Sequence, residues 1–154
     1  MASLIITASS TGPTLALNPL LTEATKSPVV QTVEYSVDRP ESLPALRIYN
    51  EIIETSKRYG ISTDNALRIA HCESGFRQYD ENGNILRGKQ NPFDTGIFQI
   101  NEKYHLEKSQ ALGFDIHQKT GNIEYAMWLM KNETNKHWKW SKGCWNEGNN
   151  LAVK

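Results

Sequence analysis

A glutamate follows a cysteine in residues 69–76, which read IAHCESGF. On a helix, Glu73 would share one face with three apolar residues that precede it by seven, four and three positions, namely Ala66, Ile69 and Ala70. A carboxylate that continues an apolar face loses hydration, which raises its pKa toward the range that a general acid needs near neutral pH. The spacing therefore makes Glu73 a candidate proton donor. A partly solvated Glu73 paired with Arg68 or Arg77 would fit the same helix.

A second group of polar residues stands in residues 96–101, which read GIFQIN. Gln99 and Asn101 alternate with apolar side chains, and Gly96 admits a close approach of the backbone. Amides supply both donors and acceptors, which suits the recognition of sugar hydroxyls, but they can equally satisfy the backbone of a loop. Asp94 adds a second carboxylate just before this segment.

Two helices are expected to lead up to Glu73. Residues 42–60 carry apolar side chains at helical spacing and end at Gly60, a residue type favoured just after a helix; the face consists of Leu46, Tyr49, Ile52 and Ile53. The second helix is predicted to begin after a cap at Ser62 or Thr63 and to end at Gly75. Glu73 would then lie in the last turn of the second helix.

A β-hairpin and a further helix are predicted after Glu73. Asn82-Gly83 is a strong signal for a two-residue turn between short runs that can pair, and Asn91-Pro92 would end the ribbon. Residues 122–133 are expected to form a helix capped by Thr120, with an apolar face of Ile123, Ala126, Met127 and Met130.

Composition favours one compact domain. The chain has 154 residues, 38% hydrophobic and 22% charged, which suits a single core. Lys plus Arg equals Asp plus Glu at 17 each, and the charges are interspersed, which argues against a nucleic-acid partner. The apolar runs are far shorter than the ~20 residues of a membrane-spanning helix.

Residues 1–40 differ in composition from the rest. They are rich in Thr, Ser, Pro and short aliphatic residues, which predicts an N-terminal extension or linker before a domain at 41–154. Met1-Ala2 is typical of an added start, so a secretion signal is expected to have been removed upstream. Within this stretch an alternating set could form one edge strand: Val29, Val33, Tyr35 and Val37.

The segments 73–75 and 96–101 resemble those of the lysozyme-like superfamily of peptidoglycan-cleaving enzymes, over roughly residues 45–145. In its lytic transglycosylase branch, E-S-G carries the catalytic Glu, G-[LIM]-[MF]-Q-[IL] lines the cleft, and an N-x-x-x-A helix, matched here by Asn122 and Ala126, packs behind it. The resemblance implies an α+β, mainly α, lysozyme-like fold with a small β-hairpin beside the active-site cleft.

The same resemblance implies roles for individual residues. Glu73 would be the catalytic acid, and the candidate substrate-binding residues are Ser74, Gln99, Asn101 and Tyr125. Aromatic side chains offer surfaces for sugar rings, and the candidates are Tyr104, Tyr125 and the Trp residues. Because Phe98, Trp128 and Trp140 could equally be core residues, only Tyr125 is selected as a binder. No cofactor or metal is implied.

Cys72 and Cys144 extend the likeness to resuscitation-promoting factors. In those small secreted cell-wall enzymes, the cysteine of a C-E-S-G segment bridges to one near the C-terminus after a Trp-rich stretch, which resembles Trp138 and Trp140 before Cys144. The implied disulfide would close a loop of about 70 residues and contribute ~4 kcal/mol. Two unrelated thiols are the alternative. A disulfide and a peptidoglycan substrate predict a secreted, periplasmic or surface protein.

Asp94 determines which reaction is expected. Animal-type lysozymes carry a second catalytic Asp in a D-Y-G-I-[LF]-Q segment, and Asp94 stands in a similar place. If it faces Glu73 across the cleft, retaining hydrolysis follows. If it caps a turn after Pro92, Glu73 acts alone as acid and base and yields 1,6-anhydro ends. The prediction is the second: a monomeric lytic transglycosylase acting on glycan strands, with a muramidase, a non-catalytic glycan binder or a structural or inhibitory surface protein as alternatives.

Overall fold

The computed structural model describes residues 33–35 and 37–146, and all of them belong to one compact unit. Val29 lies outside the described residues, while Val33, Tyr35 and Val37 are in no strand, so for these three the predicted edge strand is wrong. Val37 is instead buried, and its carbonyl accepts a hydrogen bond from the Tyr49 hydroxyl. The end of the expected extension therefore packs on the helical unit.

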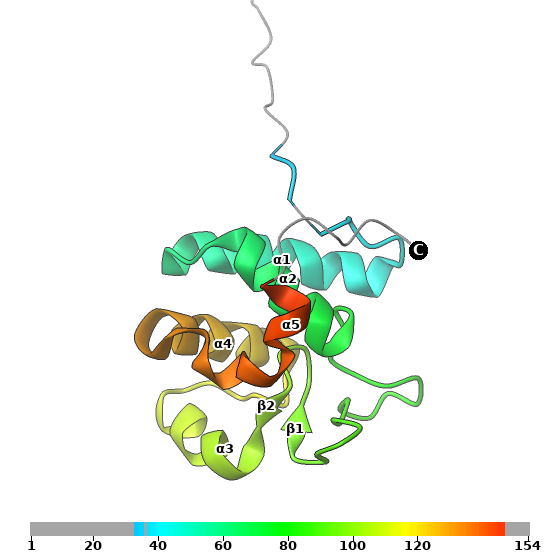
Figure 1. Ribbon diagram of the computed structural model, residues 1–154. Coiled ribbons are helices and arrows are strands. Elements are labelled where there is room, and N and C mark those ends of the chain that lie inside the picture. The colour runs from blue at the N-terminus through cyan, green and yellow to red at the C-terminus, as the bar shows by residue number, and fades with distance from the viewer. Residues whose placement is uncertain (1–32, 36, 147–154) are drawn as a thin grey trace, which may run out of the picture. The chain divides into compact units, whose positions relative to one another are not determined.

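The first two helices form where the sequence predicts them (Figure 1). Helix α1 spans Leu43–Tyr59 and α2 spans Thr63–Ser74. Gly60 and Gly75 each end their helix in the left-handed conformation, with φ of 70° and 61°, which a residue without Cβ adopts at little cost. Ser62 caps α2 by accepting a hydrogen bond from the backbone N–H of Asn65.

The hairpin after α2 differs from the prediction. Tyr79 and Ile85 form only an isolated antiparallel bridge, and the loop between Asp80 and Asn84 has three residues instead of a two-residue turn. The carboxylate of Asp80 accepts the backbone N–H groups of Asn82 and Asn84, which stabilises the wider loop, and Gly83 takes a φ of 80° within it.

The sheet forms further along, within the segment expected to line a cleft. Strands β1 (Asp94–Thr95) and β2 (Ile100–Asn101) are antiparallel, with Asp94 opposite Asn101. The described residues are otherwise mainly helical, which confirms an α+β, mainly α architecture with a small antiparallel sheet. No helix among them is long and apolar enough to cross a membrane.

Four further helical elements complete the described part of the chain. They are α3 (Glu102–Ala111), α4 (Lys119–Glu133), the 3-10 segment η1 (Thr134–Ser141) and α5 (Lys142–Trp145). The predicted cap at Thr120 is wrong: α4 is preceded by Gln118, and the Thr120 hydroxyl donates to Glu51 on α1. This contact ties the start of α4 to α1.

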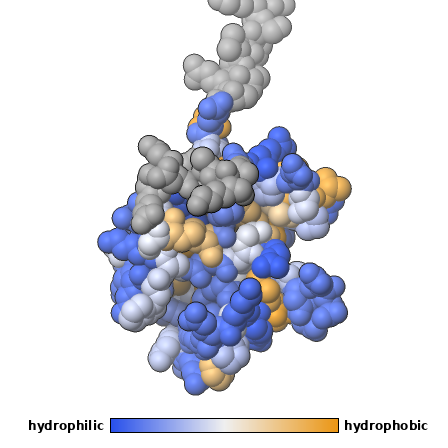
Figure 2. Space-filling model, turned by 45° about the vertical axis from the view of Figure 1, so that its right-hand side comes forward, coloured by the Kyte–Doolittle hydropathy of each residue, from blue (hydrophilic) through white to orange (hydrophobic). Residues whose placement is uncertain are grey.

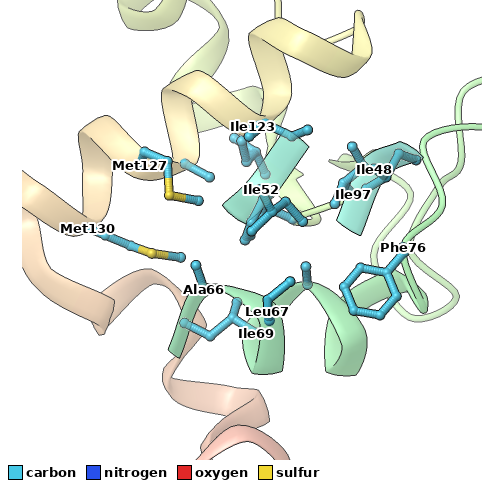
Figure 3. Packing of buried hydrophobic residues seen from close by; sticks show 14 of the residues in the cluster. Ile48, Ile52, Ala66, Leu67, Ile69, Phe76, Ile97, Ile123, Met127 and Met130 are labelled. Carbon is cyan, nitrogen blue, oxygen red and sulfur yellow. The ribbon is translucent and has the colours of Figure 1, made fainter. Parts of the chain in front are cut away.

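The core lies where α1, α2 and α4 meet (Figure 3). Ile52, Leu67 and Ile123, one from each helix, are fully buried. The predicted apolar face of residues 122–133 is confirmed, since its four members are all buried. The face of the molecule in Figure 2 is mostly hydrophilic, with apolar side chains confined to small patches.

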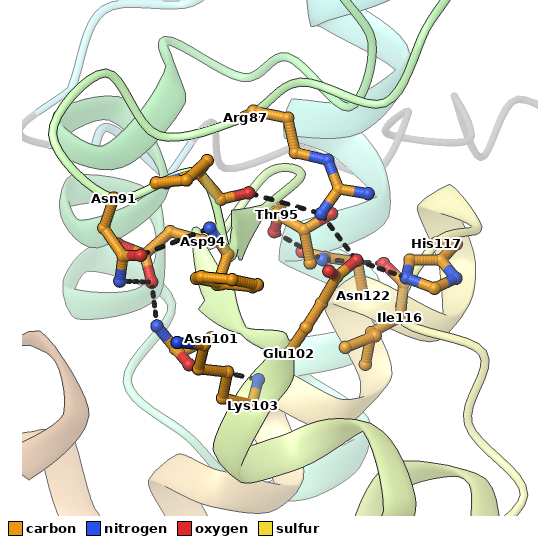
Figure 4. Close-up of polar contacts among 12 residues, drawn as sticks. Arg87, Asn91, Asp94, Thr95, Asn101, Glu102, Lys103, Ile116, His117 and Asn122 are labelled. Carbon is orange, nitrogen blue, oxygen red and sulfur yellow. Dashed lines mark hydrogen bonds and ion pairs between the residues drawn. The ribbon is translucent and has the colours of Figure 1, made fainter.

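Two buried amides hold the turn between β1 and β2 against the rest of the domain. Asn122 on α4 donates to the carbonyls of Thr95 and Ile116 (Figure 4). It also accepts a hydrogen bond from the N–H of Phe98. Gln78 accepts from the N–H of Ile97 and donates to the carbonyl of His117. The amide groups thereby satisfy buried backbone groups that the short strands leave unpaired.

Gly96 explains why these amides can approach so closely. A Cβ at this position would lie 2.4 Å from Oε1 of Gln78 and 2.7 Å from Nδ2 of Asn122, and φ is 70°. Only glycine fits both the space and the backbone conformation.

Replacing Asn122 should destabilise the fold through the turn. Asn122→Ala removes the buried side-chain partner of the Phe98 N–H and of the Thr95 carbonyl, and one of two side-chain donors to the Ile116 carbonyl, so we expect a loss of about 2–4 kcal/mol in the free energy of unfolding. Urea unfolding followed by circular dichroism measures it. Asn132→Ala, an exposed position on the same helix, is the control and should change stability by less than about 1 kcal/mol. Equal losses in both variants would contradict this account of the turn.

Candidate active site

A cleft of about 990 Å³ lies between the end of α2, the β1–β2 hairpin, α3 and η1. Its volume is at the upper end of small-molecule sites, which gives room for an extended ligand. Glu73 and Asp94 both line it. The sequence-predicted carboxylates are therefore brought to one cleft.

Glu73 is half-buried in the last turn of α2. Burial raises the pKa of its carboxyl group, a hydrogen bond from the Ser141 hydroxyl (2.5 Å) opposes the rise, and the negative charge of Asp94 adds to it. The alternative ion pairs are absent here, since Arg68 pairs with Asp64 and Nε of Arg77 donates to the Ser74 carbonyl. Glu73 thus has the direction of pKa shift that the sequence predicted.

Asp94 combines the two arrangements that the sequence left open, because it is held in a turn and also lines the cleft. Its Oδ1 accepts hydrogen bonds from the side-chain amides of Asn91 (3.0 Å) and Asn101 (2.7 Å), and its backbone N–H closes a turn to Asn91 (Figure 4). At the same time it lines the cleft and its charge acts on Glu73. Asp94 is therefore fixed in the turn after Pro92 without leaving the site.

The predicted disulfide between Cys72 and Cys144 is confirmed, with the two Cα atoms 6.0 Å apart. It joins the residue before Glu73 to the C-terminal segment. The Trp138 indole donates to the carbonyl of Phe98, and the Trp145 indole donates to the carbonyl of Trp138. The Trp-rich segment is consequently fastened to α2 and to the turn of the sheet.

Three of the four predicted substrate-binding residues line the cleft. Gln99 donates to the Gly96 carbonyl, Asn101 holds Asp94 and caps α3, and the Ser74 hydroxyl donates to the carbonyl of Ala70. Their polar groups therefore already serve the local structure.

Tyr125 requires correction. It is 0% exposed, does not line the cleft and stacks on Trp128 within the core, so its selection as a sugar-binding residue is wrong. Most of the residues around Tyr125 on α4 are buried as well, and an aromatic residue in such a helix is most often a core residue. Its hydroxyl instead lies 3.0 Å from Nδ1 of His105.

Among the cleft residues that sequence reasoning missed are Ser141, His105 and His137. Ser141 touches Glu73, and the rings of His105 and His137 line the wall with their centroids 4.8 Å apart. Burial lowers the pKa of His105 to about 4, and the charge of His137 acts in the same direction, so His105 is neutral near pH 7. Only Ser141 had a usable signal: it lies three residues before Cys144, and the disulfide brings that cysteine beside Glu73.

The arrangement can donate a proton from Glu73 to a ligand in the cleft and can present amides to ligand hydroxyls. No group of three or more potential metal ligands occurs among residues 33–35 and 37–146. Comparisons with protein-family models, curated proteins and solved structures gave no match to this chain.

Removing the Ser141 hydroxyl should raise the pKa of Glu73 further. The hydroxyl donates to the carboxylate and so favours the ionised form, and Ser141→Ala removes this donor. A ¹³C NMR titration of the Glu73 carboxyl carbon measures the change. Ser141→Thr keeps a hydroxyl and should stay near the wild-type titration. An unchanged or lowered pKa in Ser141→Ala would contradict the role given to this hydrogen bond.

Glu73→Gln should become more stable relative to wild type as pH rises. The pKa of Glu73 is raised above its ordinary value of 4.5 in the folded chain, so the folded chain keeps this proton at a pH where the unfolded chain has released it. The protonated Glu73 therefore contributes its full stability below pH 4.5, and this contribution is lost as pH rises through the folded pKa. The glutamine variant lacks this loss. Urea unfolding at a series of pH values from 4 upward measures the difference in free energy. The control is exposed Glu81→Gln, whose difference from wild type should not increase in this way; a pH-independent difference for Glu73→Gln would contradict the prediction.

Proposed function

We propose that the chain is a peptidoglycan-cleaving glycosidase of the lysozyme-like kind, with Glu73 as its proton donor. One observation carries the proposal: a carboxyl group at a helix end lines a large cleft while burial raises its pKa. Such a group keeps its proton at a pH where an exposed carboxyl group has lost it. The resemblance of residues 73–75 and 96–101 to lytic transglycosylase segments supports the same role and a lysozyme-like fold.

The proposed substrate bond is the β-1,4 bond between N-acetylmuramic acid and N-acetylglucosamine. Glu73 protonates the glycosidic oxygen as the bond to the anomeric carbon breaks. The carboxylate then accepts the proton of the 6-hydroxyl of the same muramic acid, whose oxygen bonds to the anomeric carbon and closes a 1,6-anhydro ring. Ser141 donates a hydrogen bond to Glu73 and so stabilises the carboxylate between the two proton transfers.

A second candidate reaction is hydrolysis of the same bond. It is favoured by the position of Asp94, which lines the same cleft and whose negative charge acts on Glu73. In a retaining hydrolase, the Asp94 carboxylate would either stabilise the oxocarbenium ion or attack its anomeric carbon. Water would then bond to that carbon and complete the hydrolysis. The transglycosylase reaction stays first because Asp94 is already held by two amide groups, from Asn91 and Asn101.

A peptidoglycan substrate implies action outside the cytoplasm, as a secreted, periplasmic or surface protein. The Cys72–Cys144 disulfide supports an oxidising location. A non-catalytic glycan-binding protein is the remaining alternative. It is disfavoured because burying an acid such as Glu73 lowers stability without improving the recognition of neutral sugars.

The test is a digest of purified peptidoglycan by wild type, Glu73→Gln and Asp94→Asn, with soluble products identified by mass spectrometry. We expect anhydro ends from wild type and a loss of at least about 100-fold in rate for Glu73→Gln, since general acid catalysis contributes about 10²–10⁴. Asp94→Asn should still give anhydro ends, with the high-pH limb of its activity moved to lower pH because a charge that raises the pKa of Glu73 is gone.

Exposed Glu81→Gln serves as the matched control and should cleave like wild type. Reducing ends from wild type, lost in Asp94→Asn, would replace the transglycosylase by a hydrolase. Glycan binding without products from any wall type would leave only the binding protein, and full activity in Glu73→Gln would remove the proposed acid.

A further inference from the structure

Trp140 is the most exposed large apolar side chain among the described residues, at 90%, and it lines the cleft. Trp138 and Trp145 are buried, with exposed fractions of only 4% and 6%, and Trp128 packs against the core. An indole left in water forgoes the stabilisation that burial provides, so an exposed one beside a cleft points to contact with a ligand.

The backbone that carries Trp140 is anchored on both sides. The next residue, Ser141, donates to Glu73, and Trp138 is tied to the carbonyl of Phe98. Cys144 then joins the segment to α2 through the disulfide. The backbone of Trp140 is thus held at a fixed place next to the candidate acid, so binding a ligand would order only the side chain, which lowers the entropic cost of binding.

The surroundings of the indole determine which kind of ligand fits it. Nζ of Lys139 lies over the ring, 5.0 Å from its centroid, so a ligand would meet the opposite face. The cleft beside it presents amides and carboxylates, among them Gln99, Asn101 and Asp94. A wholly apolar ligand would displace water from the polar surface of these side chains without replacing its hydrogen bonds, whereas a pyranose ring has an apolar C–H face and a rim of hydroxyl and amide groups.

We propose that Trp140 is a stacking platform for one pyranose ring of a β-1,4-linked N-acetylated glycan bound in the cleft. This inference rests on the proposed function and specifies a sugar-binding position next to Glu73. Tyr104 is 78% exposed and lines the same cleft from α3, which gives the glycan a second aromatic surface. Trp140 contributes binding, and the proton transfer stays with Glu73.

The test measures binding separately from cleavage. Three chains that all carry Glu73→Gln are compared: one with Trp140 unchanged, one with Trp140→Phe and one with Trp140→Ala. Calorimetry measures the affinity of each for the β-1,4-linked hexamer of N-acetylglucosamine. We expect Trp140→Ala to bind about tenfold more weakly and Trp140→Phe less than about threefold more weakly, because phenylalanine keeps an aromatic face. The hexamer should also protect the fluorescence of Trp140 from quenching by acrylamide, and this protection should be lost in both variants.

The control is Phe93→Ala, which removes an aromatic side chain that is 38% exposed and lies outside the cleft lining. It should leave hexamer affinity unchanged. In the active chain, Trp140→Ala should raise KM on soluble glycan strands more than it lowers kcat. Circular dichroism and thermal unfolding establish that each variant is folded.

The outcomes separate the two proposals. Equal affinity of the Trp140 and Trp140→Ala chains overturns the stacking platform and leaves a cleaving enzyme in place. Hexamer binding that depends on Trp140, with no cleavage by wild type, supports the platform while the proposed enzyme fails. No binding and no cleavage overturns both. Quenching protection that follows protein concentration instead of glycan would replace the platform by a contact between copies of the chain.

Discussion

Burying the carboxylate of Glu73 costs free energy, because a negative charge loses hydration and lies in the last turn of a helix, whose dipole disfavours it. The segments around it oppose this cost or prevent the helix end from moving into solvent. Cys72 fastens the preceding residue to the C-terminal segment, and Ser141 in that segment supplies a hydrogen bond to the carboxylate. The end of α2 is therefore connected to the tryptophan-rich segment by both the disulfide and the hydrogen bond from Ser141. A change in any of these would change the surroundings of the Glu73 carboxyl group.

The opposite wall of the cleft depends on side-chain amides more than on the sheet. Two strands of two residues each supply too few backbone hydrogen bonds to be stable alone. Gln78 and Asn122 replace them by bonding the turn from within the core, while Asn91 and Asn101 fix Asp94 from the cleft side. Polar residues that the sequence pattern assigns to ligand recognition are therefore partly used to build the wall, which leaves fewer of their polar atoms for a ligand.

How much of this the sequence predicts depends on whether the signal is local. Helices α1 and α2 follow from apolar periodicity and from glycines that end them. Helix α3 was missed because its only buried residue is Ser109, which leaves no apolar period to detect. Tyr125 is placed wrongly because an aromatic residue type suits both a core and a sugar-binding cleft, and the sequence around it does not distinguish the two. Ser141 lies 68 positions from Glu73, and a contact at that separation has no local signature without the disulfide.

In either of the proposed reactions, Asp94 would affect the chemistry even without touching the substrate. Its negative charge raises the pKa of Glu73, so it helps the acid to keep a proton in a transglycosylase as well as in a hydrolase. A loss of rate on removing Asp94 is therefore expected from both mechanisms and cannot distinguish them. They differ in which oxygen is bonded to the anomeric carbon at the end of the reaction: the substrate's own 6-hydroxyl oxygen in one and the oxygen of water in the other. The product ends carry that information, because this last oxygen stays in the product whatever the rate.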